Sequence, residues 1–200
     1  MKYMHLAALS ALLVGGIASA QASNLIVNPN FDLNVDSWDA DTSGTQFWYD
    51  PTQDANGSDA SGALAMSTAN GTNWNLDVHQ CINQVVGGQD FSFGTKIKPN
   101  TASVFGMRCA AFASTDCSGE ALAVADAVEG NPDKAGWIDF RTDAPFTLPM
   151  TAHSVVCSLL AEQPLRSGAQ PNGYATAIWA DDAFFGPGTT PVSLQSFSID

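Results

Sequence analysis

Acidic side chains are the first candidates for chemistry in this sequence, because two carboxylates placed across a glycosidic bond can hydrolyse it. Only three residues are glutamates, Glu120, Glu129 and Glu162, and no spacing marks a catalytic pair among them or the aspartates. The sequence contains no Gly-x-Ser-x-Gly elbow, His-Glu-x-x-His pair or phosphate-cradling loop. We therefore expect no catalytic residues and a protein that is not an enzyme. The remaining catalytic alternative is a hydrolase subunit that acts with a separate partner.

Aromatic residues beside amides offer a different chemistry. Trp48 and Tyr49 follow a Thr-Gln pair, Trp74 lies between two asparagines, and Tyr174 lies close to Asn172. A flat ring can cover the apolar face of a pyranose while amides bind its hydroxyl groups. We predict a carbohydrate-binding set that comprises Trp48, Tyr49, Trp74 and Tyr174, with Gln80 supplying hydrogen bonds. The alternative is half-buried packing, with the Tyr O–H or Trp N–H reaching solvent.

Two other side chains, which precede Gln80 in the same segment, admit two interpretations. His79 and Asn75 add hydrogen bonds to a ligand if their strand lines a concave face, whereas otherwise His79 is a solvated surface residue. Trp179 alternates with Ala177 in an apolar segment, so we expect its indole in the core.

The charge of the chain excludes whole classes of partner. Among 200 residues, 20 acidic side chains stand against 7 basic ones, a formal net charge of -13. Nucleic acids are bound through Lys and Arg, and an anionic membrane surface attracts the same residues, so neither is an expected partner. Apolar residues make up 45% of the chain, enough for a substantial core, and the length predicts one domain with short appendages.

The first 22 residues have the features of a secretory signal peptide. A short positive start precedes an apolar run over residues 6–17, and small residues follow at the positions that determine cleavage. The run is too short to cross a bilayer, so we expect no membrane insertion and a secreted protein, extracellular or periplasmic. The predicted organisation is a signal peptide (1–22), one domain (23–187) and a linker with tail (188–200). For the tail we expect an added edge strand, a frayed end or a recognition tag for export machinery. In the third case the tail would bind a protein partner.

The four cysteines fit an oxidising compartment. Cys109 and Cys117 flank seven residues, a length that two strand ends of a hairpin can bridge. We therefore predict the disulfides Cys109–Cys117 and, by elimination, Cys81–Cys157. A zinc site is the competing interpretation, but no Cys-x-x-Cys pair is present and the histidines lack ligand spacing.

Apolar residues alternate with polar ones or form short runs between turn residues, which is typical of an all-β protein. In residues 91–98, Phe91, Phe93 and Ile97 fall on one face and both lysines on the other. Residues 154–160 are nearly continuously apolar, as in a central strand, and residues 174–185 form the last long strand. Residues 50–62 and 119–136 read as loops. Eight to ten short strands predict a β-sandwich of two antiparallel sheets, stabilised by disulfides.

Four segments in order carry a family resemblance. They are residues 24–32 (Asn-Leu-Ile-Val-Asn-Pro-Asn-Phe-Asp, with Trp38 soon after), 80–82 (Gln-Cys-Ile), 87–93 (Gly-Gly-Gln-Asp-Phe-Ser-Phe) and 180–187 (Ala-Asp-Asp-Ala-Phe-Phe-Gly-Pro). Together they resemble the CenC-like carbohydrate-binding modules, which share the jelly roll of the galactose-binding-domain-like group. The resemblance departs from the family pattern at Asp32, which replaces Glu, at Ser37, which replaces Gly, and at Phe91, which replaces Tyr.

The resemblance implies a structural calcium ion where the first and last strands meet. Asp32 and Asp182 map onto that site, with Asp181 as the alternative, and calcium prefers such oxygen ligands. The competing interpretation makes Asp32 a turn cap and the other two solvated edge residues. The run 54–59 superficially resembles a calcium loop but has Ala65 where a bidentate Glu is needed.

The resemblance also implies a packed Trp38 and a jelly-roll β-sandwich that binds polysaccharide or oligosaccharide without cleaving it. The alternative function is a surface structural or adhesion protein that binds a protein partner or self-assembles through the same sandwich.

Overall fold

Alternating and apolar segments of the chain form the strands. The computed structural model describes residues 23–40, 44–68, 75–100, 102, 104–130, 135–142, 144–162 and 176–188. In these ranges no helix is long and apolar enough to span a membrane. The strands there are β1 (Asp39–Ala40), β2 (Thr45–Asp50), β3 (Ala63–Thr68), β4 (Asn75–Asn83), β5 (Asp90–Pro99), β6 (Val104–Phe112), β7 (Ala121–Glu129), β8 (Ile138–Arg141), β9 (Phe146–Thr147), β10 (Ser154–Glu162) and β11 (Ile178–Pro187). The predicted signal peptide and residues 189–200 of the predicted tail lie outside the described residues.

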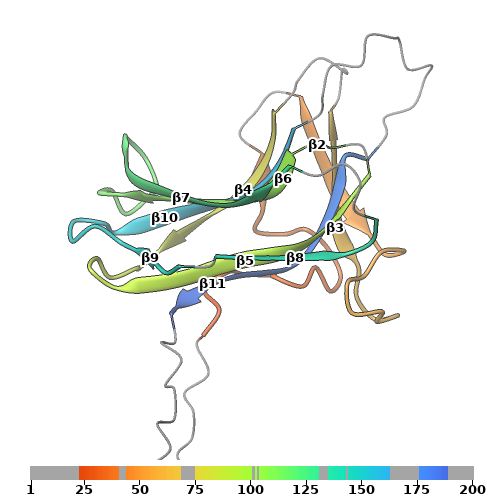
Figure 1. Cartoon of the computed structure of the whole chain (residues 1–200), viewed down its shortest axis with the longest axis horizontal. Helices are drawn as coiled ribbons and strands as arrows, with labels where there is room; N and C mark the ends of the chain where they lie inside the picture. The colour runs from red at the N-terminus through yellow and green to blue at the C-terminus, as the bar shows by residue number, and fades with distance from the viewer. Residues whose placement is uncertain are drawn as a thin grey trace, which may run out of the picture.

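The strands form two antiparallel sheets that pack face to face. Sheet A has the order β1-β4-β10-β6-β7, and sheet B has the order β2-β3-β11-β5-β8, with β9 pairing with β5. Figure 1 shows that both sheets bend, with sheet A on the inner side of the bend. The outer face of sheet A is therefore concave. This arrangement confirms the predicted all-β sandwich of two antiparallel sheets.

Inward-facing side chains of both sheets fill the core. In β5, Phe91, Phe93 and Ile97 are buried, which confirms the alternation read from the sequence. Phe91 stacks on Phe185 of β11 with ring centroids 4.8 Å apart. Each such ring contributes about 1.5–3 kcal/mol of burial free energy. The two lysines of β5 are thereby held on the outer face of sheet B.

The first described segment lies against the last strand, as the resemblance implied. The N–H of Leu25 donates to the carbonyl of Phe185 at 2.7 Å. Trp38 is buried against Phe31, with ring centroids 5.5 Å apart, and its Nε1 donates to the carbonyl of Asn28 at 3.3 Å. Trp38 is therefore a core residue, as predicted.

The predicted disulfide pairing is wrong. The structure contains Cys81–Cys117 and Cys109–Cys157 instead of Cys109–Cys117 and Cys81–Cys157. Cys109 of β6 and Cys157 of β10 are directly opposite each other and both buried in the core. Cys81 of β4 is exposed on the outer face of sheet A. Because successive strand side chains point to opposite faces, the two inward thiols can meet only each other.

We expect replacement of Cys109 and Cys157 by alanine to lower the free energy of unfolding by about 2–4 kcal/mol, because a long loop in the unfolded chain is released. Denaturant unfolding measures the loss, and the paired change of Cys81 and Cys117 to serine is the matched control for a bridge outside the core. Peptide mapping of the oxidised protein checks the pairing. A linked peptide pair containing Cys109 and Cys117 would contradict it.

Candidate functional site

A row of polar side chains crosses the concave outer face of sheet A. The strand register places His79 of β4 opposite Ser158 of β10, Ser158 opposite Arg108 of β6, and Arg108 opposite Asp126 of β7. All four alternate with core residues, so they point away from the core. The row therefore aligns imidazole, hydroxyl, guanidinium and carboxylate groups across four strands, with Ser158 itself only 6% exposed.

Two ionic contacts fix groups on this face. Nε of Arg108 donates to Oδ1 of Asp126 at 2.6 Å, and this hydrogen bond raises the pKa of Arg108 above its usual value. Nδ1 of His79 lies 3.3 Å from Oδ1 of Asp77. That oxygen of Asp77 is buried and has no hydrogen-bond partner among the described residues. Since a buried acceptor without a donor is costly, the nearby imidazole of His79 stabilises Asp77 when it is protonated.

Apolar rows flank the polar one. On one side lie Val156, Ala110 and Val124, which are opposite one another in register. On the other side Leu160 and Val128 flank Gly106. Val124 is 52% exposed. The face thus combines hydrogen-bonding groups with apolar strips, which are the two surfaces that a sugar ring requires.

Ser158, Arg108 and Asp126 are not among the site residues predicted from the sequence. Their alternation with apolar neighbours is readable in the sequence, but their alignment into one row depends on strand register. The interpretation of His79 that depends on a concave face agrees with its position, whereas the side chain of Asn75 is outside the described residues.

The structure separates the residues of the predicted carbohydrate-binding set. Trp48 lies on the outer face of sheet B, and Tyr49, next to it, packs against the core and donates its hydroxyl to the carbonyl of Asp32 at 3.1 Å. Trp74 and Tyr174 lie outside the described residues. These positions do not form one surface within the described part of the chain.

Gln80 has a structural role. Its side chain is 6% exposed, its amide donates to the carbonyls of Val27 and Ser37, and its oxygen accepts from the N–H of Val27 at 2.7 Å. These bonds fasten the first segment to β4. Because the bonds engage both ends of the amide, we remove Gln80 from the candidate site.

Trp179 is not a core residue, contrary to the expectation. Ile178 and Ala180 on either side belong to the core, so the indole of Trp179 points to the outer face of sheet B, where it is half-buried. Its Nε1 donates to Oδ2 of Asp50 at 2.8 Å. The apolar run in the sequence marked a strand, but its register decided which side chain faces outward.

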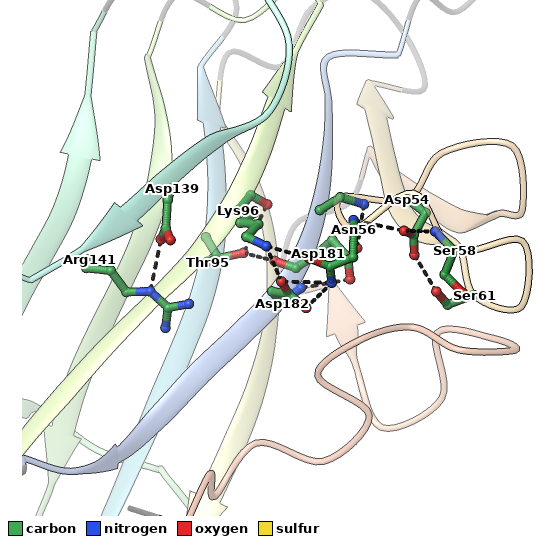
Figure 2. A network of polar contacts seen from close by, with 11 residues as sticks. Asp54, Asn56, Ser58, Ser61, Thr95, Lys96, Asp139, Arg141, Asp181 and Asp182 are labelled. Carbon is green, nitrogen blue, oxygen red and sulfur yellow. Dashed lines mark hydrogen bonds and ion pairs between the residues drawn. The ribbon is translucent and has the colours of Figure 1, made fainter.

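A polar network fastens the loop of residues 51–62 to β5 and β11 (Figure 2). Oδ2 of Asp181 accepts from the N–H of Ala55 at 2.9 Å. Nζ of Lys96 lies 2.6 Å from Oδ2 of Asp182 and 2.7 Å from Oδ1 of Asn56. The amide of Asn56 donates to both oxygens of Asp182. The network therefore joins the loop to two adjacent strands of sheet B.

Asp54 shapes the loop itself. Its Oδ1 accepts from the N–H groups of Asn56 and Ser58, and its Oδ2 accepts from the hydroxyl of Ser61. Burial would raise the pKa of Asp54, but these hydrogen bonds outweigh it and lower the pKa below the usual value. Asp54 thus stabilises the turn of the loop by accepting hydrogen bonds from three of its residues.

Asp181 is the most perturbed carboxylate of the network. It is 1% exposed, and burial, together with the nearby charges of Asp182 and Asp54, raises its pKa to about 6, although the N–H groups of Ala55 and Asp182 oppose the shift. A positive charge beside Asp181 would relieve this cost.

The calcium ligands implied by the resemblance do not gather as a set. Asp32 is exposed, and Asp182 is engaged by Lys96. In the described ranges no group of three acidic, histidine or cysteine side chains is placed to hold a metal ion. Asp181 is a buried carboxylate close to other negative charges, and each of its oxygens accepts a backbone hydrogen bond.

Calcium-free protein is expected to lose stability as the pH rises from about 4 to about 6. Folded Asp181 holds its proton up to about pH 6, whereas its ordinary pKa is 3.8, so the folded state binds more protons in this window. The loss amounts to about 3 kcal/mol for a shift of this size. Unfolding free energies across this range are expected to show a shallower decline for Asp181→Asn than for the wild type. The exposed Asp139→Asn is the control, and an unchanged slope in Asp181→Asn would contradict the assignment.

No family model and no curated protein matches this sequence. Among solved structures, the enzymatically active domain of tailspike protein 4 from bacteriophage CBA120 is similar, with a TM-score of 0.60 and 15% identity over 82% of this chain. The present chain spans 21% of that tailspike chain, about a fifth of its length.

Two carbohydrate-binding modules match over almost their whole length. The xylan-binding domain from CBM22 has a TM-score of 0.56 with 14% identity, covering 82% of this chain and 96% of its own. The CBM22-1 xylan-binding domain from Paenibacillus barcinonensis Xyn10C has a TM-score of 0.54 with 11% identity, covering 83% and 95%. The likeness does not single out the CenC-like family. The chain has the jelly-roll fold of carbohydrate-binding modules.

Proposed function

We propose that this protein is a secreted, non-catalytic carbohydrate-binding protein that holds a polysaccharide or oligosaccharide on the concave face of sheet A. The polar row from His79 to Asp126, flanked by apolar strips, is the observation that carries the proposal. The likeness in fold to xylan-binding domains supports it.

Each group of the row has a part in binding. The planar guanidinium of Arg108 and its partner Asp126 bind neighbouring hydroxyls. The apolar strips contact the C–H faces of the sugar rings. Trp74 stays in the proposal because it directly precedes Asn75, the first residue of β4, and Tyr174 stays as a prediction from the sequence.

Affinity electrophoresis in gels that contain xylan or another soluble β-glycan tests this function. The wild type is expected to be retarded, and Arg108→Met is expected to bind about tenfold more weakly, since a lost hydrogen bond to a charged group costs about 1.5 kcal/mol or more. Arg141→Met, which removes an ion-paired arginine from sheet B, is the matched control. Equal retardation of Arg108→Met and the wild type would contradict the assignment to this face.

The alternative function is a surface structural or adhesion protein. It is favoured by one observation: the edge strand β7 exposes Leu122 (42%) and Val124 (52%). An edge strand with exposed apolar side chains can pair with another chain. Self-association in sedimentation experiments, without retardation by any glycan, would support this alternative.

The proposal includes a stabilising calcium ion at Asp181. The buried carboxylate and its negative neighbours support a cation there, and calcium would supply that charge without taking part in chemistry. At calcium concentrations about 100-fold above Kd, we expect the Tm to rise by about 5–10 °C relative to protein in EDTA. Thermal unfolding measures the rise, which Asp181→Asn is expected to abolish and Asp182→Ala to reduce. An equal Tm with calcium and with EDTA would contradict calcium binding and leave Lys96 as the cation of the network.

A further inference from the structure

A second row of side chains crosses the opposite, outer face of sheet B. The register places Trp48 of β2 opposite Ala65 of β3, Ala65 opposite Trp179 of β11, and Trp179 opposite Lys98 of β5. Two indoles thus flank one methyl group. Adjacent strands are about 4.8 Å apart, so the backbones that carry the two indoles are separated by about 10 Å.

The row faces away from the core. Phe47 and Tyr49 beside Trp48 pack against the core, as do Leu64 and Met66 beside Ala65. Trp48 itself is 37% exposed, which is high for so large an apolar side chain. Ala65, the smallest side chain of the row, lies between the two indole-bearing positions and is itself fully buried.

Hydrogen bonds and a cation–π contact hold the second indole in place. Nε1 of Trp179 donates to Asp50, and Nζ of Lys98 lies 5.4 Å from the centroid of the Trp179 ring. The same ammonium group donates to Oε1 of Gln53 at 2.8 Å. Because the ammonium is engaged internally, the row suits an uncharged ligand better than an anion. Asp50 and Gln53 also fasten the loop beside the row, so the surface is ordered before any ligand arrives.

We propose that Trp48 and Trp179 form a second carbohydrate-binding surface, which takes an extended neutral glycan chain. The two strands that carry the indoles are about 10 Å apart, which matches roughly two sugar residues of an extended chain, so each indole can cover one ring face. The inference rests on the proposed function and adds a site to it. Because the two surfaces lie on opposite faces of the sandwich, one molecule would bind two glycan chains.

Isothermal titration calorimetry with neutral hexasaccharides (xylohexaose, cellohexaose and mannohexaose) tests the second surface. The wild type is expected to bind two molecules of one of these sugars. Trp48→Ala is expected to lower the association constant of one site about tenfold, and Trp48→Phe to restore most of it because a ring is retained. Leu33→Ala, which shortens an exposed apolar side chain elsewhere, is the control and is expected to leave both sites intact. An unchanged Tm of Trp48→Ala would exclude unfolding as the cause.

Combination with Arg108→Met separates this inference from the proposed function. If each variant loses one different site, both assignments hold. If Arg108→Met abolishes all binding and Trp48→Ala changes nothing, the second surface is refuted while the proposed function stands. If Trp48→Ala abolishes all binding and Arg108→Met changes nothing, the second surface holds and the concave face is refuted. Absence of binding to every sugar by the wild type would overturn both.

Discussion

The irregularity of β11 at Asp181 and Asp182 is the constraint on which sheet B depends. The register against β5 shifts between Asp181 and Phe184, and Asp182 has a positive φ of 49°. Ala180 and Phe185 are five residues apart and would face opposite sides of a regular strand, yet both are fully buried in the core. One extra residue restores the inward direction after the bulge. The chain thereby fills the core on both sides of an acidic pair.

The same bulge ties the core to the surface. Asp181 lies under the loop of residues 51–62 and accepts a backbone hydrogen bond from it, and Asp182 meets Lys96 and Asn56. A buried carboxylate is costly by itself, and hydrogen bonds worth about 1 kcal/mol or more each offset that cost. The loop in turn begins beside Asp50, which holds the indole of Trp179. The loop fastened by this network therefore starts next to the residue that holds one indole of the aromatic row.

The two sheets divide the chemistry between them. Sheet A carries hydrogen-bonding groups on its concave face, and the described part of sheet B carries indoles on its outer face. Both rows arise from the same rule, that alternate strand residues face outward, so a single sandwich offers a polar and an aromatic surface. The Cys109–Cys157 bridge inside the core joins β6 and β10, the two strands that supply Arg108 and Ser158, and so limits their relative movement.

Much of the fold could be predicted from local pattern, because alternation and turn residues are local properties. Residues 91–98 showed which side chains of β5 would be buried, whereas the core position of Trp38 was implied by the family resemblance. The pairing of cysteines could not be predicted in this way. The spacing in the sequence favoured a bridge between Cys109 and Cys117. In the folded chain Cys109 and Cys157 lie opposite each other on paired strands and both point into the core, so they form the disulfide.

The sequence by itself determined an all-β sandwich and an acidic chain, and it supplied the polar and aromatic side chains of the two outer faces. Only the tertiary structure decided which of them share a surface. The side chain of Gln80 points inward and binds the first segment, and the indole of Trp179 points outward. Arg108 lies in one row with Ser158 and His79. The physical reason is strand register: it is set by long-range pairing, and a shift of one residue moves every side chain to the other face.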